Sequence, residues 1–220
     1  YEGTQASRIA DGTIQIKAGL EVGVAASKTF TCTLVSLYLL SIYIGQIRGH
    51  LPSRAVNEII SELSGLPQML NHQLNNQDQY EAIASEYHGR DNFLFIGRGI
   101  NYPLAMEGAL KLKEISYIHA EAYPAGELKH GPIALIDESM PVIAIAPNDE
   151  LLDKLKSNLQ EVKSRGSQMI VFEDKDSKVK PLKAMEIIPV TSNLGRITAP
   201  IIFTIPLQLL SYHIALIKGT

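Results

Sequence analysis

The chain has 220 residues, of which 45% are hydrophobic and 20% are charged, and its formal net charge is -3. This composition is ordinary for a globular protein with a sizeable core, and it argues against a basic nucleic-acid surface. The single cysteine, Cys32, cannot form an internal disulfide and predicts a reducing, cytoplasmic setting.

The N-terminal part of the chain predicts one short strand followed by helices. Gly19 and Gly23 indicate a loop, and Ser27 is placed to cap the apolar helix that follows. Pro52 interrupts the helical pattern and starts an amphipathic stretch. The expected elements are a strand over residues 13–16 and helices over residues 27–45, 52–74 and 80–87.

From Asn92 onward the pattern changes to strands, glycine turns and helices in alternation. Strands are expected over residues 93–96, 142–146, 169–172 and 185–190, and helices over residues 104–116, 131–136, 151–165 and 200–217. Short connections between strands and helices favour a parallel sheet covered on both faces. The fold class is therefore α/β, a three-layer αβα sandwich around a doubly wound, Rossmann-like parallel sheet.

Two apolar stretches resemble membrane spans by composition. The first, residues 34–47, is too short by count to cross a bilayer. The second, residues 197–217, contains Pro200, Pro206 and His213, which favours a buried helix. No basic and apolar leader opens the sequence, so we expect neither export nor a membrane partner.

A glycine turn, Gly97-Arg98-Gly99, follows the first strand of the sheet and enters a helix. Ligands of parallel α/β sheets bind at this end of the strands, so the turn marks a candidate binding edge. The glycine spacing does not complete a dinucleotide fingerprint, which disfavours NAD. No histidine or cysteine spacing indicates a metal site, and we expect no cofactor.

Glu107, Lys111 and Glu114 are spaced so that all three lie on one face of the helix after this turn. Two interpretations remain open from spacing alone. The three groups could tune one another and carry a proton in aldose–ketose isomerisation, or they could be a solvated Glu–Lys pair, which is the commoner situation. His130 stands in a turn before a short helix, where an imidazole could assist opening of a sugar ring or simply face solvent.

Long sequence stretches resemble glutamine:fructose-6-phosphate aminotransferases. The stretches EGALKLKEISYIHAEAY and GELKHGP, at residues 107–123 and 126–132, are similar to the hallmark of that family's second sugar-isomerase (SIS) domain. AGLEVGVAASKTF, at residues 18–30, is similar to a loop and helix near the end of its first sugar-isomerase domain, and PLQLLSYHIALIKGT to its last helix. The resemblance implies a first-domain remnant over residues 1–50, a helical linker over 51–90 and a second domain over 91–220.

The resemblance also implies the activity and the roles of individual residues. The substrates would be fructose 6-phosphate and glutamine-derived ammonia, and the product glucosamine 6-phosphate. Glu114 would move a proton between C1 and C2, with Glu107 and Lys111 beside it. His130 would assist ring opening in the site of the other subunit, which implies a homodimer without nucleic acid or membrane.

The family's substrate loop is expected over Val24, Ala26 and Ser27. The backbone of Val24 would face the sugar, while Ala26 stands where a serine is usual, so Ser27 would have to supply any hydroxyl contact. The family's glutaminase domain, its phosphate-gripping loop and its catalytic lysine in the C-terminal tail are not found in this sequence. We therefore expect the chain alone to be inactive towards fructose 6-phosphate.

Two other classes of function remain open. One is a sugar-phosphate or sugar-nucleotide sensor that uses the fold without catalysis, and the other is a glutamine-independent deaminase or isomerase. The sequence upstream in the gene would separate them: a glutaminase domain that begins with cysteine indicates the aminotransferase, a helix-turn-helix indicates the sensor, and neither indicates the deaminase.

Overall fold

The computed structural model describes residues 3–191, 195 and 197–220. The chain divides into two compact units, Tyr1–Ser61 and Glu62–Thr220, which we describe separately. The proposed division at residues 50 and 90 stays a prediction, and residues 1 and 2 of its first part lie outside the described residues.

The first unit contains helices and an extended loop. It comprises α1 (Gln5–Ile9), α2 (Lys28–Ile47) and the beginning of α3 (Ser53–Leu74). The strand expected over residues 13–16 is wrong, because that segment is extended without strand pairing. A strand needs a neighbour for its hydrogen bonds, and the described part of this unit offers none.

The second unit is built on a five-stranded parallel sheet in the order β2-β1-β3-β4-β5. The strands are β1 (Asn92–Gly97), β2 (His119–Pro124), β3 (Val142–Ala146), β4 (Met169–Glu173) and β5 (Met185–Pro189). Its helical elements are α4 (Gln77–Tyr87), α5 (Asn101–Ser116), α6 (Leu152–Ser164), α7 (Thr198–Lys218) and the 3-10 turns η1 (Ala125–His130) and η2 (Pro132–Leu135). This confirms the three-layer α/β fold.

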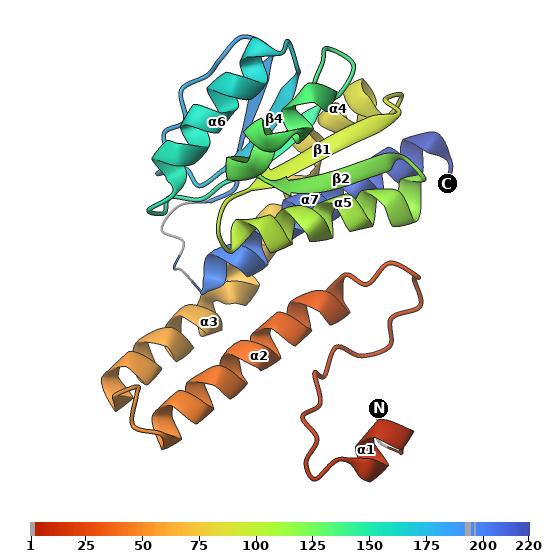
Figure 1. Ribbon diagram of the computed structural model, residues 1–220. Helices are drawn as coiled ribbons and strands as arrows, with labels where there is room; N and C mark the ends of the chain where they lie inside the picture. The colour runs from red at the N-terminus through yellow and green to blue at the C-terminus, as the bar shows by residue number, and fades with distance from the viewer. Residues whose placement is uncertain (1–2, 192–194, 196) are drawn as a thin grey trace. The chain divides into compact units, whose positions relative to one another are not determined.

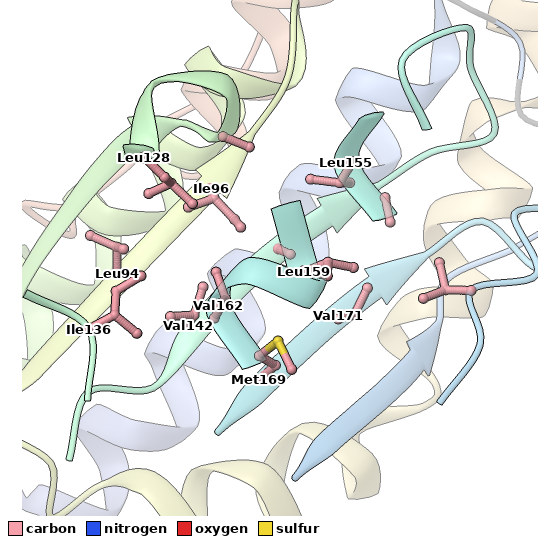
Figure 2. Close-up of a cluster of buried hydrophobic side chains, with 14 of the residues drawn as sticks. Leu94, Ile96, Leu128, Ile136, Val142, Leu155, Leu159, Val162, Met169 and Val171 are labelled. Atoms are coloured by element: carbon pink, nitrogen blue, oxygen red, sulfur yellow. The ribbon is translucent and has the colours of Figure 1, made fainter. Parts of the chain in front are cut away.

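The two faces of the sheet are covered by different helices (Figure 1). Side chains of β1 alternate between them, as in any strand. Phe95 points towards α5 and α7, where Gly108 lets its ring approach closely. Leu94 and Ile96 point to the opposite face and join the apolar cluster of α6 and η1, in which Figure 2 shows side chains of β1, β3 and β4 meeting those of α6.

Gly97 ends β1 at a place where no larger residue fits. A Cβ atom there would lie 2.3 Å from the backbone oxygen of Asn101, closer than real Cβ contacts. The chain can therefore turn tightly from β1 into α5 only with glycine at this position. This turn sets where α5 begins and hence where its polar side chains lie.

The four strands that the sequence predicts after Asn92 are confirmed within one residue at each end, but β2 was not expected. β2 pairs with β1 along the edge of the sheet, from His119 opposite Asn92 to Pro124 opposite Gly97. Its sequence, HAEAYP, contains no Val, Ile, Leu or Phe and so lacks the apolar run by which the other strands were found.

Two of the described helices, α2 and α7, are long and apolar enough to cross a membrane by length and composition alone. α7 has 78% of its most apolar window buried, as expected for a core helix. α2 has 20 residues, so the expectation that this stretch is too short for a span is wrong. The apolar stretch was counted only from residue 34, whereas the helix begins at Lys28.

Candidate functional site

The polar stripe expected on α5 lies at the edge of the helix face that packs into the second unit. Leu104, Gly108 and Leu112 occupy the centre of that face and are buried. Glu107, Lys111 and Glu114 follow one another along one side of it, at helical spacings of four and three residues. The face towards solvent carries Met106, Leu110 and Lys113 instead.

Lys111 joins the two carboxylates of this stripe, and most of the cluster is buried. Its Nζ atom lies 2.5 Å from Oε2 of Glu114 and 3.5 Å from Oε1 of Glu107. Lys111 is 4% exposed and Glu107 9%, while the Glu114 side chain keeps 28% of its surface. A solvated surface pair is therefore excluded for Lys111 and Glu107. The arrangement is a buried ammonium between two carboxylates, of which one reaches solvent.

The two carboxylates of the stripe differ in environment. Burial raises the pKa of Glu107 above its ordinary value, against the opposing effect of the Lys111 ammonium. Oε1 of Glu107 is also buried without a hydrogen-bond partner in the described part of the chain. Glu114 is held by Lys111 and accessible from outside, so it is the member of the stripe that a substrate can reach.

His130 ends η1 and projects from the second unit. Its side chain is 71% exposed, and its Nδ1 lies 2.7 Å from Oε2 of Glu127, one 3-10 turn earlier. A carboxylate on Nδ1 fixes the orientation of the imidazole and leaves Nε2 facing outward. Sequence reasoning gave no role to Glu127, although the spacing of the two residues could have suggested this pair.

The structure does not bring His130 to the polar stripe within one copy of the chain. η1 follows directly after β2 at the carboxyl edge of the sheet, where α5 also begins. Glu114 lies near the other end of α5, which at 1.5 Å per residue is about 20 Å away along the helix. No hydrogen bond or ion pair among the described residues links His130 to Glu107, Lys111 or Glu114.

Within the described residues, no basic side chain joins the glycine turn at the carboxyl edge to make an anion site. A cleft of about 220 Å³ opens there, and among its described lining residues are the acidic Asp149, Glu150 and Asp174 but no lysine or arginine. Asn101 donates from Nδ2 to Oδ2 of Asp149 at 3.1 Å across this edge. Arg98 turns away from the cleft towards Asn158.

The expected substrate loop lies in the first unit, beside α2. A concavity of about 790 Å³ is lined by residues of the extended segment 13–24 and the start of α2, including Val24 and Ala26. Val24 is fully open to solvent there. Ser27 stands at the N-cap position as expected, but its hydroxyl donates to Oε1 of Glu21 at 2.9 Å and makes no capping bond to the helix.

Glu21 takes over the capping role, which sequence reasoning missed. Its carboxylate accepts from the backbone N–H groups of Ser27, Lys28 and Thr29 and from the Thr29 hydroxyl. These N–H groups are the ones that lack a partner at the start of a helix. The carboxylate also favours the positive end of the helix dipole. Glu21 therefore ties the loop that carries Val24 and Ala26 to α2.

The Glu21 carboxyl is expected to titrate near pH 2. The hydrogen bonds from the Thr29 side chain and the Ser27 backbone lower its pKa to about 2. Because folding lowers this pKa, the charged carboxylate stabilises the cap at pH values above the ordinary pKa of 4.5. This stabilisation is lost as the pH falls from 4.5 towards 2. Carbon-detected NMR titration of the Glu21 carboxyl checks this, and a midpoint near 4 would contradict the capping geometry.

The remaining histidines form no site in the described residues. His213 is buried in α7 with Nε2 unpartnered, and its ring contacts Tyr212 edge-on. No group of His, Cys, Asp or Glu among the described residues could hold a metal ion.

The second unit is thus an α/β domain, a parallel sheet with a buried Glu–Lys–Glu cluster along one of its helices. The SIS domain model matches residues 86–218, and the chain belongs to the SIS domain family. The match covers the whole sheet and α5, α6 and α7, and so includes Glu107, Lys111, Glu114 and His130.

Similar proteins include both enzymes and solved structures. The glutamine–fructose-6-phosphate aminotransferase (isomerizing) of Pseudomonas putida is 53% identical over 97% of this chain and 35% of its own length. The C-terminal domain of glucosamine-fructose-6-phosphate aminotransferase from Francisella tularensis superposes with a TM-score of 0.89 at 47% identity, over 93% of this chain and 57% of that one. Glucosamine-6-phosphate deaminase from Thermotoga maritima shares the fold, with a TM-score of 0.63 at 23% identity, over 91% of this chain and 55% of that one. The chain spans about a third of the length of the curated relatives it matches.

Proposed function

We propose that this chain is the sugar-isomerising part of a glutamine:fructose-6-phosphate aminotransferase that makes glucosamine 6-phosphate. The observation that carries the proposal is the buried Lys111 between Glu107 and the accessible Glu114. Burying an ammonium is costly unless it is paired, and a binding protein without catalysis has no use for a proton carrier. The similarity to aminotransferases over nearly the whole chain supports the same activity.

Each member of the stripe has a separate role in the proposed reaction. Once ammonia has condensed with the C2 carbonyl of the open-chain sugar phosphate and water has left, Glu114 takes a proton from C1 and returns it to C2, so the carboxylate is regenerated in each cycle. Lys111 fixes Oε2 of Glu114 through the 2.5 Å ion pair. Glu107 supports Lys111 from the other side, at 3.5 Å. No metal or redox cofactor is needed for this transfer.

The position of His130 supports a homodimer. In one copy, His130 lies at the end of the sheet from which Glu114 is most distant, and its imidazole projects outward with Nδ1 held by Glu127. We propose that it assists ring opening in the site of a second copy, where Val24, Ala26 and Ser27 of the substrate loop contact the sugar. The setting is the cytoplasm, with no nucleic-acid or membrane partner.

The test is an assay of the full-length enzyme that carries this sequence. With fructose 6-phosphate and glutamine, glucosamine 6-phosphate is expected to accumulate together with glutamate. Binding of the sugar phosphate without turnover would indicate a sensor instead. Release of ammonia from glucosamine 6-phosphate, with no response to glutamine, would indicate a deaminase.

A further inference from the structure

Arg98, in the turn after β1, is held between the start of η1 and α6. Its guanidinium lies against the backbone of Gly126, where an added Cβ would be 3.1 Å from Nη2 and 3.2 Å from Nη1. Nη1 donates to Oδ1 of Asn158 on α6 at 2.7 Å. The flat guanidinium can lie against Gly126 while it donates to Asn158, and lysine has no such planar group.

The contacts of Arg98 continue through α6 and return to η1. Asn158 is 6% exposed and donates from Nδ2 to Oε2 of Glu161 at 3.2 Å. The other oxygen of Glu161, Oε1, forms an ion pair of 2.8 Å with Nζ of Lys129. Lys129 is the residue directly before His130. A continuous set of polar contacts therefore runs from the turn after β1 to the neighbour of His130.

η1 is fixed from its inner side as well. Ala125 and Leu128 are fully buried in the apolar cluster beneath it. A 3-10 turn has poorer hydrogen-bond geometry than an α-helix, so its position depends on such outside contacts. The apolar anchors set the depth of η1, and the Arg98 contacts set its position along the sheet edge.

We infer that Arg98 is a positioning residue for His130, acting through Gly126 and through the Asn158–Glu161–Lys129 contacts. The inference rests on the proposed role of His130 in ring opening. Arg98 touches no substrate in this scheme, because its partly buried guanidinium is directed towards η1 and α6. It places the imidazole for the reaction, and a displacement of about 1 Å at a reacting group can lower a rate by about 100-fold.

The test is a double-mutant cycle in the full-length enzyme, with kcat/KM for fructose 6-phosphate as the measurement. Arg98→Met, which keeps an unbranched stem but removes the guanidinium, is expected to lower kcat/KM by roughly 10- to 100-fold in the otherwise unchanged enzyme. In a His130→Gln background the same change is expected to have little further effect, since the group that Arg98 positions is already gone. Arg165→Met, at an exposed site after α6, is the matched control.

Each outcome decides a different point. Equal losses from Arg98→Met in both backgrounds, or a loss below about twofold, would overturn the inference. If His130→Gln has normal kcat/KM, both the proposed role of His130 and the inference about Arg98 are wrong. If His130→Gln is impaired but Arg98→Met is normal, only the inference about Arg98 is wrong. If Arg98→Met does not fold, Asn158→Asp is used in the same cycle, because it keeps an acceptor for Arg98 but loses the donor to Glu161.

Discussion

Replacement of Glu114 by glutamine is expected to slow proton transfer between C1 and C2 of the sugar phosphate by roughly 10²- to 10⁴-fold, the usual contribution of a positioned acid–base group. The amide keeps the size of the side chain and an oxygen that can accept from Lys111, but it cannot take up a proton. The measurement is conversion of fructose 6-phosphate, and exchange of its C1 hydrogen with deuterated solvent, in the full-length enzyme.

Glutamine hydrolysis is expected to survive better in Glu114→Gln, because the proposed enzyme carries it out in a separate domain. The matched control is Glu81→Gln, the same change at an exposed carboxylate of α4. If Glu114→Gln isomerised the phosphosugar at a near-normal rate, the cluster on α5 would be structural only, and the proposed mechanism would have to be abandoned.

Replacement of Lys111 by methionine is expected to lower the free energy of unfolding by about 3 kcal/mol, as when one partner of a buried ion pair is removed. Methionine fills a similar volume, so the loss comes from the Glu107 carboxylate that stays buried without its cation. Urea unfolding followed by circular dichroism measures it. Lys113→Met, two residues away on the exposed side of α5, is the matched control and should change stability little.

The destabilisation of Lys111→Met should depend on pH in a definite direction. Burial already raises the pKa of Glu107, and without the ammonium it rises further. A carboxyl group whose pKa is raised by folding binds its proton more tightly in the folded state, so stability falls as the pH rises from the ordinary value of 4.5 through the raised pKa. The variant should therefore be less destabilised at pH 5 than at pH 8. The double variant Glu107→Gln, Lys111→Met should recover most of the lost stability. If Lys111→Met were equally destabilised at pH 5 and pH 8, the loss would not come from the buried Glu107 carboxylate.

The sequence predicted the sheet best where the strands are apolar along their whole length. β3 and β4 are buried on both faces, as parallel strands between two helical layers must be, and their apolar runs identify them directly. β2 lies at the edge and is only partly buried, so its alternation of small and polar residues gave no such signal. Conversely, residues 13–16 have the composition of a strand but join no sheet among the described residues.

The candidate site was predictable in its residues but not in its environment. The spacing of Glu107, Lys111 and Glu114 is visible in the sequence, whereas the burial that distinguishes this cluster from a solvated surface pair depends on how the rest of the unit packs around α5. Long-range partners are hidden for the same reason. Arg98 and Asn158 lie 60 positions apart, and no local pattern links them.

The polarity of β2 has a consequence for the behaviour of the protein at high concentration. An edge strand exposes unpaired N–H and C=O groups that can join the sheet of another molecule and start aggregation. β2 carries Glu121 and His119 with partly exposed side chains, and it ends at Pro124, which has no N–H to donate. At the opposite edge β5 also ends in a proline, Pro189. The feature that concealed β2 from sequence analysis thus helps to keep the sheet from growing beyond its five strands.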